Sequence, residues 1–139
     1  MNIELNLEIL ETLALETLQT ELNEDDTLNL LRIFSEEVLE RSQLYCPFVN
    51  GRLKNSVKFK YSNNSYFISY NTPYAIYVHE LIGNIHKPPT RAKFLENAFF
   101  TVYREFYLEF GKGNIPPFDY KMTYSLEKVE MQIYIKGAL

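Results

Sequence analysis

The chain has 139 residues, of which 46% are hydrophobic and 23% are charged, so it can bury a substantial core within one domain. This composition argues against global disorder, which needs fewer apolar residues. The net charge of −4, from 14 basic and 18 acidic residues, argues against a nucleic-acid-binding protein with a generally basic surface.

The N-terminal part of the chain predicts a short strand followed by a helix. Apolar and polar residues alternate over 3–7, which favours the strand. Apolar residues then recur every four positions over 10–22, which is helical spacing. The polar segment 23–26 interrupts this pattern and supplies N-cap residues and negative charge for the start of a second helix.

The second predicted helix carries its apolar face at Leu28, Leu31, Phe34 and Val38. Pro47 cannot continue a helix, and it favours extended geometry at the residue before it. We therefore expect the helix to end near Leu44 or Tyr45.

From Leu53 to Tyr70 the apolar residues alternate, which predicts an antiparallel hairpin. Asn63 and Asn64 are expected to form its turn, because asparagine tolerates positive φ. Leu53 is expected to begin the buried face of the first strand. Val57, Phe59 and Tyr61 share one face of the first strand, and Tyr66, Ile68 and Tyr70 alternate along the second.

The middle of the chain is ambiguous before a strong helix. Segment 74–81 fits either a third strand or a short helix, and 81–90 is expected to be a loop. A helix is predicted from about Arg91 to Phe110, where Gly111 and its neighbours end it. Its buried face is expected to carry Leu95, Ala98, Phe99, Val102, Phe106 and Phe110.

A second hairpin is predicted at about 118–136, with its turn near Glu127 and Lys128. This apolar ribbon needs a cover, either from the chain's own sheet or from a neighbouring subunit. The elements together predict an α+β fold in a single domain, 1–139. It consists of a small antiparallel β-sheet packed against two main helices, with an N-terminal helix and a C-terminal β-hairpin.

The sequence contains little that indicates catalysis or metal binding. His79 and His86 are seven residues apart, with no further ligands at a familiar metal spacing. His79 beside Glu80 invites a general-base role, but such a pair in an aromatic segment is more often structural. Cys46 has no base near it in sequence and is expected to be a half-buried packing residue. We therefore expect no catalytic residue, no cofactor and no metal.

The cysteine content, the absence of long apolar runs and the placement of basic residues indicate the compartment and the kind of partner. A single cysteine cannot form an intrachain disulfide, which fits assembly in a reducing cytoplasm. The first residues lack the layout of a signal peptide, and no apolar run approaches the ~20 residues of a membrane helix, so we expect a soluble protein. A solvated strand face explains one basic group more simply than a local nucleic-acid patch does. This group is Arg52, Lys54, Lys58 and Lys60.

Three segments share a pattern of fold-forming residues. The first is a proline, a turn, Gly-Arg-Leu and a serine, the second is a Tyr-Ala pair with a later histidine, and the third is Phe-Leu with a later alanine. In chain order these residues are Pro47, Gly51, Arg52, Leu53, Ser56, Tyr74, Ala75, His79, Phe94, Leu95 and Ala98. The ordered set, within about 26–110, resembles the head–tail joining or tail-completion family of long-tailed bacteriophages. The hairpin at about 118–136 lies outside the resemblance.

The sequence departs from the family pattern at two places. Asn50 stands where the family usually has Thr or Ser before the glycine, which is a tolerable exchange in a turn. Leu81 and Ile82 delay the glycine that commonly follows the second segment, so the loop there is expected to differ.

The matching residues have physical roles in the fold. Gly51 permits a turn that a side chain would strain, and Arg52 can donate several fixed hydrogen bonds. Ser56 can bond to backbone near the turn. Phe94 and Leu95 are expected to anchor the last family helix on the sheet.

The resemblance implies a virion structural protein at the neck or tail terminus, made in the host cytoplasm. Relatives form closed rings, so the chain is expected to assemble as a hexamer or dodecamer around the DNA channel. Other neck, connector and tail-tube proteins are its expected partners, with DNA only as passing cargo and no membrane. The alternative is a small non-catalytic adaptor or regulatory protein-binding module. An enzyme and a direct DNA-binding protein fit the sequence less well.

Overall fold

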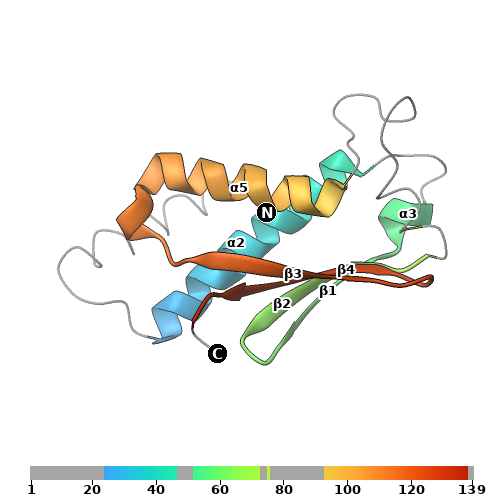
Figure 1. Ribbon diagram of the computed structural model, residues 1–139, viewed down its shortest axis with the longest axis horizontal. Coiled ribbons are helices and arrows are strands. Elements are labelled where there is room, and N and C mark those ends of the chain that lie inside the picture. The colour runs from blue at the N-terminus through green and yellow to red at the C-terminus, as the bar shows by residue number, and fades with distance from the viewer. Residues whose placement is uncertain (1–23, 47–51, 73–74, 76–92, 138–139) are drawn as a thin grey trace.

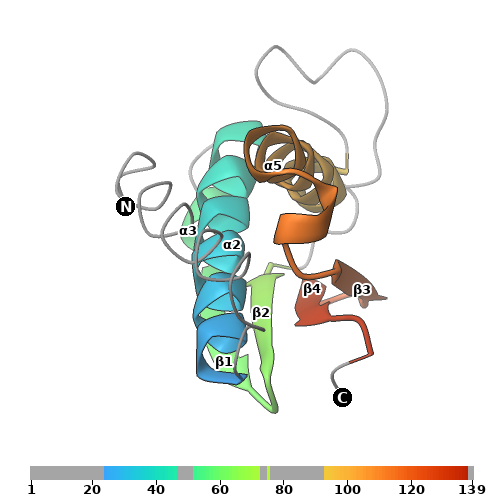
Figure 2. The ribbon, with the colours of Figure 1, turned by 90° about the vertical axis from the view of Figure 1, so that its left-hand side faces the viewer.

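The computed structural model describes residues 24–46, 52–72, 75 and 93–137, and it has the predicted α+β fold. Two long helices lie side by side on one face of an antiparallel sheet (Figures 1 and 2). The helices are α2 (Glu24–Tyr45) and α5 (Phe94–Phe110). The strands are β1 (Val57–Ser62), β2 (Ser65–Tyr70), β3 (Phe118–Tyr124) and β4 (Val129–Ile135), in the sheet order β1-β2-β4-β3.

Some expectations fall outside this part of the chain. The predicted strand at 3–7, the N-terminal helix at 10–22, the ambiguous segment 74–81 and the loop 81–90 all lie outside the described residues, apart from Ala75. None of the helices that the structure describes is long and apolar enough to cross a membrane.

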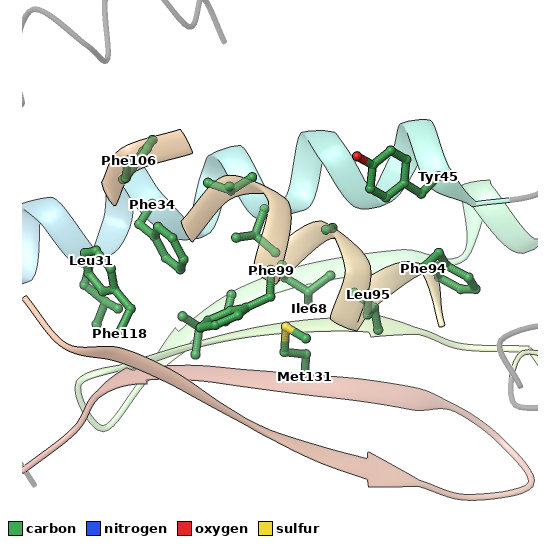
Figure 3. Close-up of a cluster of buried hydrophobic side chains, with 14 of the residues drawn as sticks. Leu31, Phe34, Tyr45, Ile68, Phe94, Leu95, Phe99, Phe106, Phe118 and Met131 are labelled. Carbon is green, nitrogen blue, oxygen red and sulfur yellow. The ribbon is translucent and has the colours of Figure 1, made fainter. Parts of the chain in front are cut away.

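Helix α2 has the predicted bounds and contributes the centre of the core. Phe34 is fully buried and stacks on Phe118 of β3, with ring centroids 4.1 Å apart. Its ring also meets Phe99 and Phe106 of α5 edge-on, at 5.3 and 5.4 Å (Figure 3). Phe34 therefore joins both helices to the sheet through a single side chain.

Helix α5 confirms the predicted apolar face, since all six of its residues are buried. Gly111 ends the helix with a φ of 85°, and its N–H bonds to the carbonyl of Tyr107 at 2.9 Å. That positive φ is accessible to glycine at little cost. The helix begins at Phe94, directly after the left-handed residue Lys93, while Arg91 lies outside the described residues.

The first hairpin confirms the predicted turn, because Asn63 and Asn64 have φ values of 53° and 58°. The expected role of Leu53 in a strand is wrong. Residues Arg52–Asn55 form a single helical turn, α3, from which Leu53 points into the core. Four residues are too few to separate a helical period from an alternating one, so the pattern could not reveal this turn.

The C-terminal hairpin has its cover within the same chain. Strand β4 pairs with β2 as well as with β3, so it lies inside the sheet. The predicted turn is confirmed by a hydrogen bond from the Ser125 N–H to the Lys128 carbonyl, 2.9 Å long. Alternate residues of β4 are buried beneath the helices, namely Val129, Met131, Ile133 and Ile135.

Candidate functional site

The described members of the three matching segments gather mainly in the core. Five of them are at most 4% exposed and belong to one buried cluster: Leu53, Ala75, Phe94, Leu95 and Ala98. Arg52 is exposed on α3, and Ser56 is partly buried in the turn just before β1. The remaining four lie outside the described residues: Pro47, Gly51, Tyr74 and His79.

Ser56 links the turn of α3 to the end of β2, and its predicted hydrogen bond to backbone is confirmed. Its hydroxyl donates to the Leu53 carbonyl at 2.6 Å and accepts the Asn71 N–H at 3.0 Å. The Asn71 side-chain amide returns a bond to the Ser56 carbonyl at 3.2 Å. Ser56 therefore holds together two segments fifteen positions apart.

A buried polar cluster lies close to this junction. The hydroxyl of Tyr70 is 2.8 Å from the Ser42 hydroxyl and accepts a bond from the Gln43 amide at 2.8 Å. The ring of Phe94 meets Tyr70 edge-on, with centroids 4.9 Å apart. Burial raises the pKa of Tyr70, and the two side-chain hydrogen bonds only partly oppose this shift. Tyr70 therefore acts as a neutral structural link between α2 and the sheet.

Cys46 is buried more deeply than the expected half-buried position, with no exposed surface. Burial raises the pKa of its thiol to about 12, although nearby Lys54 pulls it downward. The thiolate, which is the reactive form, is therefore scarce at neutral pH. This environment favours the packing role that was predicted for Cys46.

The described residues contain no group of three or more His, Cys, Asp or Glu side chains that could hold a metal ion. His79 and His86 lie outside this part of the chain. Lys58 and Lys60 are exposed on the outer face of β1, and the Lys60 ammonium lies 5.5 Å from the ring centre of Phe67. These two positions fit a solvated strand face.

The described residues also form an aromatic surface patch that the sequence reasoning did not identify. We call it the α5–β3 surface and define it by Glu96, Phe100, Tyr107, Tyr120 and Tyr124. Phe100 is 57% exposed and lies 5.6 Å from the ring of Tyr120. The Tyr124 hydroxyl donates to Glu96 at 2.6 Å, which links the helix to the edge strand.

A signal for this surface is present in the sequence. Phe100, Tyr103 and Tyr107 recur at helical spacing along one flank of α5, beside the buried face. The longer apolar face accounts for the helix on its own, so this second stripe does not by itself indicate a surface.

No protein-family model, no curated protein and no solved structure matches this chain. The likeness to the head–tail joining family therefore stays a hypothesis.

Proposed function

We propose that this protein is a structural component of the neck or tail terminus of a long-tailed bacteriophage. It forms a ring that completes the tail or joins it to the head connector around the DNA channel. One observation carries the proposal: the three segments that resemble the head–tail joining family contribute to one buried cluster. Leu53, Ala75 and Leu95 represent the three segments there, and each is at most 4% exposed.

This convergence supports the proposal because it explains why a family would share these particular residues. They are far apart in the chain, yet each has a packing role in the same core. A shared core is the basis of a shared fold, and function is then added on surfaces. The polar matching residue, Ser56, also serves the fold by holding α3 against β2.

The proposed role is mechanical and non-catalytic. Copies of the chain meet through one heterologous interface that repeats until the ring closes, as a hexamer or dodecamer. A net charge of −4 suits a wall beside passing DNA, because a strongly basic lumen would retain the phosphates. The partners are neighbouring copies and other neck, connector and tail-tube proteins.

The proposal is tested by deleting the coding sequence from the source phage and imaging the particles by negative-stain electron microscopy. DNA-filled heads and tails should accumulate unjoined, and the wild-type protein supplied in trans should restore virions. Leu53→Asp should fail to restore them, because it places a charge in the core. Lys58→Asp, on the exposed face of β1, serves as the matched control and should restore them. Normal virions without the protein would refute the proposal.

A non-catalytic adaptor is the second candidate, and the exposed apolar flank of α5 favours it. Phe100 and Tyr107 are 57% and 41% exposed, which is typical of residues that capture a protein partner. Absence from purified virions, together with a one-to-one complex with another protein, would support the adaptor over the ring.

A further inference from the structure

The sheet has an open edge at β3 in the described part of the chain (Figure 2). Two hydrogen bonds show which residues of this strand turn their backbone N–H and C=O groups toward β4. They run from the Ser125 N–H to the Lys128 carbonyl and from the Lys136 N–H to the Pro117 carbonyl, and both are 2.9 Å long. Odd-numbered residues of β3 therefore direct their backbone groups toward β4. The residues whose N–H and C=O groups point toward the open edge are Tyr120, Met122 and Tyr124, together with Phe118, whose N–H already bonds to the Pro116 carbonyl at 2.9 Å.

Asp119 covers part of this edge in the single chain. Its carboxylate accepts the outward-pointing N–H of Tyr120 at 2.8 Å. Charged side chains commonly protect open strand edges in this way. Lys121 is exposed two residues further on and shares the outer face of the sheet with Asp119. The edge therefore carries one acid and one base in adjacent positions of the same face.

We propose that β3 pairs antiparallel with β3 of a second copy of this chain, about a two-fold axis at Tyr120. In this register Asp119 lies opposite Lys121 of the second copy, and Lys121 lies opposite its Asp119. The pairing thus forms two cross-strand ion pairs. Asp119 exchanges its bond to the Tyr120 N–H for one of them, and that N–H then bonds to the second copy.

Charge selects this arrangement over the alternatives. Moving the axis to Lys121 places the two Lys121 side chains opposite each other, and moving it to Asp119 does the same to the two Asp119 side chains. Pairing β1 with itself brings Lys58 and Lys60 together, and β1 contains no acid to offset them. Pairing β3 with β1 in the register that sets Asp119 against Lys60 also sets Lys121 against Lys58. Only the axis at Tyr120 forms two attractive pairs with no repulsive one.

The α5–β3 surface flanks the same edge and provides apolar contact area. Phe100, Tyr107 and Tyr124 are 57%, 41% and 42% exposed. Aromatic side chains bury 150–250 Å² each, so three half-exposed rings contribute about 300 Å² per copy. A stable interface needs about 800 Å² per partner, and the strand edge supplies only part of the difference. The dimer is therefore weak, with a dissociation constant in the micromolar range.

This inference does not depend on the proposed function, because a closed two-fold pair requires no ring. Sedimentation equilibrium of the full chain, from low to high micromolar concentration, measures the dissociation constant. Asp119→Lys and Lys121→Asp should each weaken the dimer about tenfold, because each replaces two attractions with two repulsions. The double variant should restore nearly the original constant, because both ion pairs form again with their charges exchanged.

Lys58→Asp on β1 is the matched control and should leave the constant unchanged. Thermal unfolding verifies that each variant folds. If Asp119→Lys fails to fold, Asp119→Asn removes the charge, keeps an acceptor for Tyr120, and should weaken the dimer to a smaller extent. A chain that stays monomeric at every concentration would overturn the proposal. So would an oligomer that the charge changes leave intact, or tighter association in Lys121→Asp, which would indicate pairing with β1.

Discussion

Replacing Phe34 with alanine tests whether one side chain joins the two helices to the sheet. The ring is fully buried and contacts rings of α5 and β3. Burial of roughly 200 Å² of aromatic surface at about 25 cal/mol/Å² gives an upper bound of about 5 kcal/mol. Partial collapse of the cavity lowers this, so Phe34→Ala should reduce the free energy of unfolding by about 3–5 kcal/mol.

Urea unfolding followed by circular dichroism measures this loss, and a thermal scan should show the midpoint falling by about 10–15 °C. Phe34→Leu should lose less, because it keeps most of the apolar volume. Leu108→Ala is the control, since its side chain is 71% exposed and should change stability by less than about 0.5 kcal/mol. A Phe34→Ala loss no larger than that of the control would refute the packing of the Phe34 ring against both α5 and β3.

Ser56→Ala should cost about 1–2 kcal/mol in urea unfolding, because it removes the hydroxyl that links α3 to Asn71, whereas Ser56→Thr should retain most of the stability. Burial raises the pKa of the Cys46 thiol from 9.0 to about 12. The contribution of the buried neutral thiol to the free energy of unfolding is therefore complete below pH 9 and is lost as the pH rises toward 12. Urea midpoints should therefore fall over this window, and Cys46→Ala should make the fall shallower; an unchanged slope would contradict the burial of the thiol. The two bonds from Arg41 to Glu105, at 2.8 and 2.9 Å, join partly exposed side chains, so a double-mutant cycle with alanine should give a coupling of about 0.2–1 kcal/mol. A coupling near zero would show that water competes successfully for both groups.

Long periodic segments were predictable because burial imposes their pattern directly. The six predicted apolar residues of α5 recur at helical spacing, and the four of β4 alternate with polar residues as in a strand. All ten are buried. The turn at Asn63 and Asn64 was equally predictable, since asparagine is one of the few residues besides glycine that adopt positive φ at low cost.

Features set by tertiary contacts could not be read from the chain. The single turn of α3 is too short for a period, and the bonds of Ser56 that close it involve Asn71, fifteen positions later. The place of β4 between β2 and β3 depends on strand order, which local pattern does not contain. The exposed flank of α5 was visible as a spacing, but only the position of β3 beside it makes that flank one surface with Tyr120.

The order of the strands has a consequence for synthesis. Strand β4 is the last described strand to be made, yet it fills the gap between its neighbours. About 60 residues separate the end of β2 from the start of β4, and a ribosome needs roughly 3–12 s to translate them at ~5–20 residues per second. During that interval the edge of β2 that later pairs with β4 lacks this partner, and strands of other nascent chains on the same message can pair with it. We therefore expect unpaired β2 edges to favour aggregation on crowded polysomes.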